Sequence, residues 1–318
     1  RGPRVRVGEG AWFLRPRSGP GSSGGVERFV NEYEVAPEAV DASVAEPNGF
    51  KVAVVGSGPG GMACADELAK LGYAVTIFES QSRAGGLLVN GIPSFKLNKK
   101  IVERRLDLLR RRGVTFRCGI MVGRDIPLSA LRAQFDAVYL AIGAQKPKQL
   151  DFSGADLGGV FDALPFLIQK NVEHISDPLQ IDVRGKRVAV LGGGDTAMDC
   201  LRTAIRSGAA EAICIYRRDL ENMPGSGREY ANAIEEGSKI MFLTNPIELS
   251  GDATATVADA RCGRMHLGEP DAKGRRKPQM IPGSEFTIPV DVVLVAYGFD
   301  PVPIFAAGNS DNIQVNSW

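Results

Sequence analysis

Short apolar runs alternate with amphipathic segments along the chain, in the order expected of an α/β protein. An apolar run at 51–55 is followed by a glycine-rich loop, a helical pattern that ends at Gly72, and a second apolar run at 74–79. Short continuous apolar runs are typical of strands buried on both faces, and a glycine after a periodic segment ends a helix. The pattern therefore predicts a strand, a loop, a helix and a parallel strand.

The same order of elements begins again near Lys186. A strand-like run at 187–191 precedes a second glycine loop, a helical pattern at 196–208 and a strand-like run at 212–218. Two long occurrences of strand, loop, helix and strand are not the short period of a solenoid. We therefore predict an α/β fold with two doubly wound, Rossmann-like dinucleotide-binding units and parallel sheets.

Other patterns predict elements with less distinctive signals. Asn98 is placed to cap a helix that Gly113 ends, and Ser226 with Glu229 has the spacing of a capping box. The remaining predictions are helices at 26–35 and 228–237, strands at 114–120, 137–143, 239–243, 253–268 and 285–298, and a turn at 269–278.

Composition and charge exclude several classes of function. The chain has 318 residues, 44% of them hydrophobic and 24% charged, with a net charge of +1. We therefore expect no nucleic-acid partner and no membrane partner. The five cysteines contain no C-x-x-C pair and there are two histidines. This pattern argues against a redox disulfide, an iron–sulfur cluster and a histidine metal site, and favours buried thiols in the cytoplasm.

The first glycine loop fits a dinucleotide fingerprint. Gly56, Gly58 and Gly61 have the spacing G-x-G-x-x-G between a predicted strand and helix. Such glycines permit a tight turn, close approach to a pyrophosphate and close helix packing, while the helix N-terminus attracts the phosphates. Glu79 ends the next strand, where a carboxylate binds ribose hydroxyls and repels a 2′-phosphate. We predict FAD or NAD(H) here; the alternative is an ordinary glycine turn with an exposed glutamate.

The second glycine loop has the opposite charge at the corresponding place. Gly192, Gly194 and Ala197 form the fingerprint, and Arg217 with Arg218 ends the following strand. Guanidinium groups bind phosphate through a planar set of donors, which favours NADPH over NADH. A solvated basic strand end is the alternative. Two different dinucleotides in one chain indicate a flavin-dependent pyridine-nucleotide oxidoreductase, in which hydride transfer needs positioning rather than a catalytic histidine or cysteine.

Three further segments have two interpretations each. The positive charges of 98–112 are either solvated around one buried face or a docking surface for a partner subunit. The segment 91–96, "GIPSFK", is either a loop over the flavin or a plain connection. Met223 and Pro224 fit a turn before the capping box better than a cofactor contact.

Four segments, at 83–105, 191–209, 216–229 and 267–286, closely resemble the small (beta) subunit of bacterial NADPH-dependent glutamate synthase. The resemblance runs from Val26 to Trp318. It implies a subunit that takes hydride from NADPH onto FAD and passes electrons through iron–sulfur clusters to a large (alpha) subunit, where glutamine and 2-oxoglutarate yield glutamate.

The resemblance also implies a domain plan in which the NADPH domain is inserted into the FAD domain. Chain crossings are implied at 141–143 and 296–301. The expected divisions are a disordered or non-native leader at 1–25, a short helix and linker at 26–49, the first part of the FAD domain at 50–150, the NADPH domain at 151–290, and a truncated return to the FAD domain at 291–318.

The same resemblance implies which residues line the two cofactor sites, and it implies no catalytic side chain. FAD is expected to contact Gly56, Gly58, Pro59, Gly60, Gly61, Glu79, Gly86, Leu87, Val122, Gly143 and Gly298. NADPH is expected to contact Gly192, Gly193, Gly194, Asp195, Thr196, Arg217 and Arg218.

Two parts of the family's pattern are missing. The amino-terminal cysteine clusters are absent, so the cysteines present support no iron–sulfur cluster, and the carboxyl-terminal Gly-Asp segment beneath the flavin is absent as well. We expect a fragment of such a subunit. The alternatives are the flavoprotein subunit of a ferredoxin–NADP transhydrogenase and a truncated nucleotide-binding remnant without catalysis. The lack of a cysteine pair disfavours a disulfide reductase.

Overall fold

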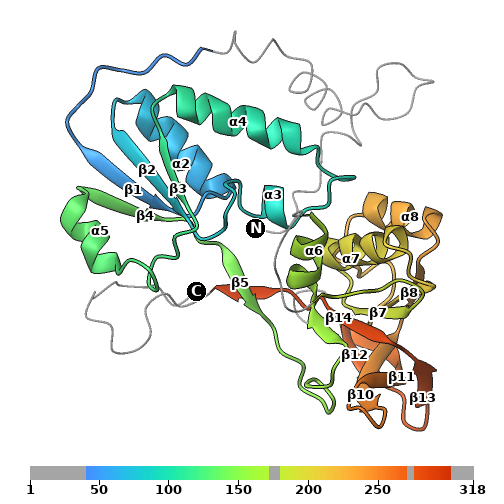
Figure 1. The fold of residues 1–318 in the computed structure, drawn as a ribbon. Helices are drawn as coiled ribbons and strands as arrows, with labels where there is room; N and C mark the ends of the chain where they lie inside the picture. Colours follow the sequence, from blue (N-terminus) through green and yellow to red (C-terminus); the bar gives the residue numbers. More distant parts are fainter. Residues whose placement is uncertain (1–40, 172–179, 271–275, 302–318) are drawn as a thin grey trace, which may run out of the picture.

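The computed structural model describes residues 41–171, 180–270 and 276–301. The leader predicted at 1–25 and the helix predicted at 26–35 lie outside these ranges. The described residues form two α/β units that are connected by a pair of extended strands (Figure 1). None of the helices in these ranges combines the length and the apolar character needed to cross a bilayer.

The first unit is a four-stranded parallel sheet with helices on both faces. In spatial order its strands are β3 (Thr115–Cys118), β2 (Ala74–Glu79), β1 (Lys51–Val55) and β4 (Ala137–Leu140). Its helices are α2 (Pro59–Lys70), α3 (Leu87–Asn90), α4 (Lys99–Arg111) and α5 (Leu128–Gln134). Val54 and Ile77 pack towards α2 and α4, whereas Ala53 and Phe78 pack towards α5. The strands are therefore buried on both faces, as their continuous apolar runs predict.

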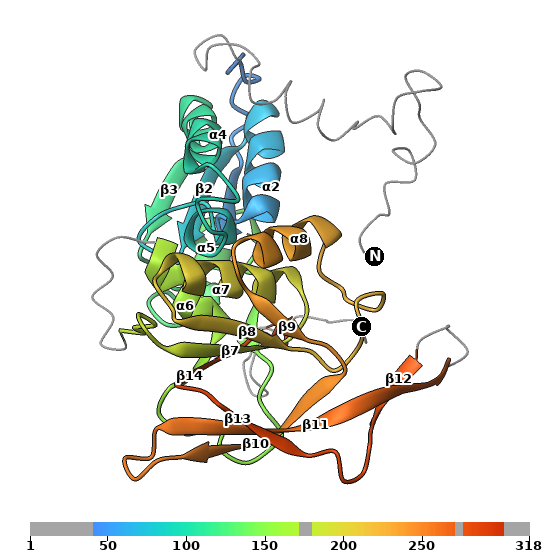
Figure 2. The same cartoon turned by 90° about the vertical axis from the view of Figure 1, so that its right-hand side faces the viewer.

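The second unit has three layers, with a five-stranded parallel sheet in the middle (Figure 2). In spatial order the strands are β6 (Val160–Asp162), β14 (Val292–Val295), β7 (Arg187–Leu191), β8 (Glu211–Ile215) and β9 (Lys239–Met241). One face carries α6 (Ala163–Asn171), α7 (Asp195–Arg206) and α8 (Gly227–Glu235). The other face carries an antiparallel sheet of β10 (Thr244–Gly251), β11 (Val257–Pro270), β12 (Arg276–Met280) and β13 (Phe286–Pro289). The two parallel sheets confirm the predicted fold class.

The antiparallel layer departs from the sequence prediction in three places. The strand β10 was not predicted, and β12 begins inside the predicted turn at 269–278 and runs two residues beyond it. The single strand predicted at 285–298 is two strands, because β13 pairs with β11 while β14 inserts between β6 and β7. Since β14 belongs to the second unit, the chain leaves that unit after β14 and not at residue 291 as expected.

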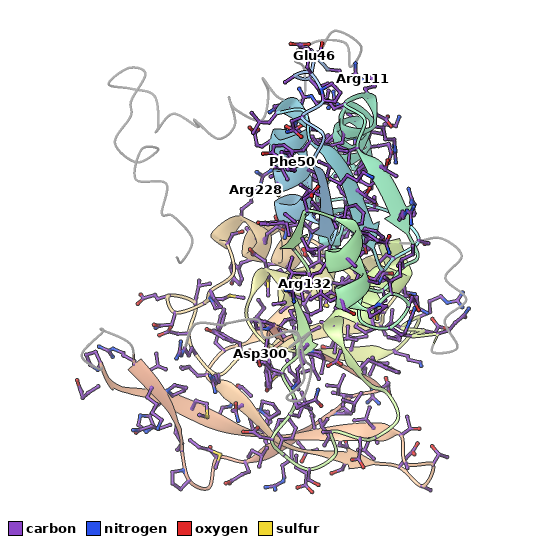
Figure 3. The ribbon with its side chains drawn as sticks, turned by 90° about the vertical axis from the view of Figure 1, so that its left-hand side faces the viewer. Glu46, Phe50, Arg111, Arg132, Arg228 and Asp300 are labelled. Atoms are coloured by element: carbon purple, nitrogen blue, oxygen red, sulfur yellow. The ribbon has the colours of Figure 1, made fainter. Side chains whose placement is uncertain are left out.

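The connection between the units is a two-stranded antiparallel ribbon of β5 (Ala144–Pro147) and β15 (Phe299–Pro301). The chain therefore enters and leaves the second unit side by side, which is the arrangement expected of an inserted domain. Figure 3 shows Asp300 of β15 at the junction of the two units, with Glu46 and Arg111 at the opposite end of the first unit.

Both predicted helix caps are present, but one differs in detail. The Asn98 side chain accepts from Lys100 N at 3.0 Å. Ser226 Oγ accepts from Glu229 N at 3.2 Å, which is one half of the capping box. The other half is missing, because the Glu229 carboxylate pairs with Arg202 and Ser226 N donates to Asp195 instead. The charge-assisted hydrogen bond from Arg202 is stronger than the bond that Glu229 would accept from Ser226 N, so the glutamate pairs with the arginine.

Candidate functional site

Both glycine loops lie at the carboxyl end of a central parallel strand. The first loop follows β1 and leads into α2, and the second follows β7 and leads into α7. In doubly wound sheets this edge is where ligands bind, because helix N-termini and strand ends meet there. Each loop is therefore a candidate binding site.

The first loop separates glycines needed for packing from glycines that face open space. Gly56 has a φ of +102°, and a Cβ there would lie 2.5 Å from the Ala141 carbonyl oxygen. A Cβ on Gly61 would lie 1.9 Å from the oxygen of Gly56. In contrast, a Cβ on Gly58 or Gly60 would meet no atom within 4 Å. The helix α2 has no side-chain cap, so its first N–H groups and the open backbone fit an anionic group such as a pyrophosphate.

Glu79 is buried beside this loop, with 5% of its surface exposed. Its carboxylate accepts from Ser57 N at 3.0 Å and from Gln81 N at 2.8 Å, and also from the hydroxyls of Ser57 and Ser80. These four bonds use the four lone-pair positions of a carboxylate. The alternative of an exposed glutamate is therefore wrong. A ribose hydroxyl can bind Glu79 only by sharing or replacing one of these donors.

Ser57 is a site residue that the sequence reasoning missed. It is fully buried, and its hydroxyl donates to Glu79 while accepting from Gly85 N at 2.9 Å. Ser57 thus connects the first glycine loop to the loop after β2. Its position between the first two glycines of the fingerprint was the only local signal, and polarity there does not by itself predict a buried partner.

The other residues predicted for FAD divide between the first loop and the ribbon. A Cβ on Gly86 would lie 2.7 Å from Gly58 Cα, which places Leu87 and the start of α3 next to the loop. Ile120 N donates to Glu79 O at 2.9 Å, so the segment after β3 that contains Val122 passes the carboxyl end of β2. Gly298 lies elsewhere, because its carbonyl accepts from Lys148 N in the ribbon. Contacts of these residues with FAD stay a prediction.

The second loop repeats the division between packed and open glycines. Gly192 has a φ of +133°, and a Cβ there would lie 2.4 Å from the Ala296 oxygen. Gly193 packs against the Tyr216 ring, which a Cβ would approach to 2.6 Å. Gly194 faces open space, and α7 also lacks a side-chain cap. This loop therefore fits an anionic ligand at Gly194 and the first turn of α7.

The segment after β8 folds back over the second loop. Gly225 N donates to Gly193 O at 3.0 Å, and Ser226 N donates to the exposed Asp195 at 2.9 Å. The predicted contact residues at 192–196 are thus covered on one side by 225–226. The arginines that follow β8 lie at the same edge of the sheet, because β8 runs parallel to β7.

Arg217 and Arg218 lie directly beyond the end of β8. Gly192 N donates to Ile215 O at 3.3 Å, so the strand end borders the second loop. Arg217 is exposed, while Arg218 is half-buried and its Nε has no hydrogen-bond partner among the described residues. Burial raises the pKa of Tyr216, and the charges of Arg218 and Arg217 partly oppose that rise. The arginines therefore present positive charge next to the second loop, as a 2′-phosphate would require.

The cysteines of the described residues are free, and the deepest ones are poor nucleophiles. Cys200, Cys214 and Cys262 are buried. Burial raises the pKa of Cys214 to about 12 and that of Cys262 to about 11, and it also raises the pKa of Cys200. A thiol in such surroundings stays protonated at neutral pH. Within the part of the chain that the structure describes, no group of His, Cys, Asp and Glu side chains could hold a metal ion.

The segment 91–96 contacts the second unit, which neither sequence interpretation foresaw. Lys96 Nζ lies 2.9 Å from Asp199 Oδ1 on α7.

The basic helix α4 buries Val102, Leu106, Leu108 and Leu109, as the expected apolar face requires. Several of its charges are paired rather than free, since Arg110 contacts Glu103 and Asp107.

Comparison with known proteins gives consistent results. Residues 50–318 match the family described as pyridine nucleotide-disulphide oxidoreductase. The glutamate synthase [NADPH] small chain of Azospirillum brasilense is 41% identical, over 99% of this chain and 67% of that protein. The putative oxidoreductase AegA of Escherichia coli (strain K12) is 42% identical, over 99% of this chain and 49% of that protein. The chain thus spans about half to two thirds of these curated relatives.

A solved structure supports the fold. Mycobacterium tuberculosis FprA in complex with NADPH has a TM-score of 0.70 and 23% sequence identity, over 81% of this chain and 72% of that chain. At this identity the likeness concerns the arrangement of the two units and not their ligands.

Proposed function

This chain belongs to the pyridine nucleotide-disulphide oxidoreductase family, and we propose that it is the NADPH-oxidising flavoprotein part of a glutamate synthase small subunit. The observation that carries this proposal is the contrast in charge between the two glycine loops. A carboxylate, Glu79, lies against the first loop, whereas the cations Arg217 and Arg218 lie against the second. The relatives named as glutamate synthase small chains support the choice of reaction.

We place FAD on the unit that begins at residue 50 and NADPH on the unit between β6 and β14. The open backbone of Gly58 and Gly60 and the N-terminus of α2 would hold the FAD pyrophosphate. Gly194 and the N-terminus of α7 would hold that of NADPH, and Arg217 with Arg218 would bind its 2′-phosphate. Together the two bound cofactors supply hydride transfer from nicotinamide to flavin. The protein's own task is to bind and orient them.

We further propose that the electrons pass to a large (alpha) subunit, where glutamine and 2-oxoglutarate yield glutamate. The support is that several of the relatives are small chains of such an enzyme. Free and mostly buried thiols are in keeping with a cytoplasmic location.

The test is to purify the chain, record its visible absorption, and add NADPH and then NADH without oxygen. We expect a yellow protein whose flavin absorption bleaches with NADPH and much less with NADH. Addition of a glutamate synthase large subunit with glutamine and 2-oxoglutarate then tests the onward transfer: because the described cysteines support no iron–sulfur cluster, glutamate should form only if the large subunit takes electrons from the flavin directly. A colourless protein that still binds NADPH would contradict the proposal and support a nucleotide-binding remnant.

A further inference from the structure

The segment 91–96 makes a second connection between the two units, in addition to the ribbon of β5 and β15. It starts directly after α3 and ends with Phe95 and Lys96 against α7. At its beginning, Gly91 O accepts from Asn171 Nδ2 at the end of α6, at 2.9 Å. We name this segment, together with the side chains of α7 that it contacts, the latch.

Phe95 rests on two cations of α7. Its ring centroid lies 4.4 Å from the guanidinium carbon of Arg202 and 4.4 Å from that of Arg206, within the range of cation–π attraction. The two guanidiniums are themselves fixed, because both donate to Glu236 at 2.7–3.0 Å and Arg202 also donates to Glu229 at 2.7 Å. The ring therefore packs on a rigid charged surface.

Lys96 completes the charge balance of this surface. Its Nζ lies 2.9 Å from Asp199 Oδ1 and 3.9 Å from Glu229 Oε2. Asp199 is buried, and burial raises its pKa while Lys96 opposes that rise. The latch itself contains three cations, Lys96, Arg202 and Arg206, and one carboxylate, Asp199, while Glu229 and Glu236 of α8 and its C-cap supply two further carboxylates. Removal of Lys96 leaves Asp199 as a buried carboxylate beside another carboxylate, which is unfavourable for the closed contact.

The latch segment is fixed within its own unit. Lys99 Nζ, in the first turn of α4, donates to Leu88 O at 2.8 Å and also to Ile92 O. These bonds connect α3, the segment and α4. The backbone that carries Phe95 and Lys96 is therefore held in place by hydrogen bonds within the first unit.

We propose that the latch sets the angle between the two units, and that Phe95 and Lys96 are its positioning residues. The covalent connection is a two-stranded ribbon, which by itself is only marginally stable and resists rotation weakly. The contacts of Phe95 and Lys96 with α7 supply the missing constraint. One consequence rests on the proposed function: hydride transfer depends steeply on how the two cofactors are oriented, so opening the latch slows it.

The direct test is the distance between the units. A genetically encoded keto amino acid at Ala133 on α5 and at Ala231 on α8, both exposed, accepts spin labels without using the native thiols. Pulsed electron paramagnetic resonance should give one narrow distance distribution for the parent and a broad or double one for Phe95→Ala with Lys96→Met. Lys96→Arg alone keeps a positive charge opposite Asp199, so this variant should keep the narrow distance distribution of the parent. An unchanged distribution in the double variant would overturn the proposal.

A matched control separates the latch from a general loss of charge. Lys239 pairs with Glu211 at 2.6 Å inside the second unit. Lys239→Met therefore also removes an ion-paired lysine, but it should leave the distance distribution as in the parent. The same broadening in Lys239→Met would show that the effect is not specific to the latch and would count against it.

A kinetic measurement tests the positioning role. The dissociation constant for NADPH should stay within about two-fold of the parent in Phe95→Ala with Lys96→Met, because the second loop is untouched. The rate of flavin bleaching should fall roughly 10- to 100-fold. A broadened distance with an unchanged bleaching rate would overturn the positioning role. If the parent holds no flavin, the proposed function fails, while the distance measurement still decides whether the latch sets the angle.

Discussion

The two glycine loops have the same backbone design and opposite uses of charge. In each loop a positive-φ glycine packs against a neighbouring strand end, and a later glycine faces open space. At the first loop the charged residue, Glu79, is buried and accepts hydrogen bonds from the loop itself. At the second loop Arg217 is exposed, and Arg218 keeps a buried Nε without a partner.

This difference shows that a charge at a strand end can have two tasks. A buried carboxylate is stable only when its lone pairs are satisfied, so Glu79 necessarily takes part in building its loop. The exposed guanidinium of Arg217 can exchange water for phosphate with little change in the fold. We infer that the first loop couples stability to recognition, whereas the second keeps them separate.

The largest expected effect is on the second loop. Replacement of both arginines, Arg217→Ala with Arg218→Ala, should weaken NADPH binding by about 1.5–3 kcal/mol for each lost charged hydrogen bond. NADH lacks the 2′-phosphate, so its binding should change little. Isothermal titration of both nucleotides measures this difference, and the urea midpoint of unfolding should stay near that of the parent. An equal loss for both nucleotides would remove the phosphate role from these arginines.

A neighbouring pair of glycines tests whether the packed and open positions of the first loop differ. Gly61→Ala places a Cβ 1.9 Å from the Gly56 carbonyl oxygen, so the backbone must shift. The substitution should therefore lower the free energy of unfolding by up to about 3 kcal/mol. Gly60→Ala adds the same methyl group to open space and is the matched control. Urea denaturation followed by circular dichroism compares the two. Similar midpoints for both variants would mean that the loop relaxes freely, contrary to the geometry.

A smaller effect should follow from Glu79→Gln. The amide nitrogen cannot accept from the donors that one carboxylate oxygen now satisfies, so the free energy of unfolding should fall by about 1–3 kcal/mol. FAD retention should fall with it, because recognition and stability share this side chain. Glu235→Gln, at an exposed position on α8, is the control. If Glu79→Gln lost flavin while keeping the parent's urea midpoint, the carboxylate would serve the ribose alone.

Much of the fold was accessible to local patterns. The runs at 51–55 and 187–191, the glycines after them and the caps at Asn98 and Ser226 were each predicted within a few residues. Such signals depend on backbone sterics and on burial over one turn or one strand, which neighbouring residues determine. The segment at 285–298 was predicted less well, because its break at Val290 and Asp291 reflects a change of layer and not a change of pattern.

The sequence by itself determined the order of the elements and the sign of charge at each glycine loop, because both follow from residues close together in the chain. Only the tertiary structure decided that Glu79 is enclosed by Ser57 and Gln81, and that Phe95 and Lys96 meet α7. Lys96 and Asp199 are 103 positions apart. Contacts of this kind form only when separate elements pack. The free energy of bringing distant segments of the chain together therefore selects them, and not the local pattern.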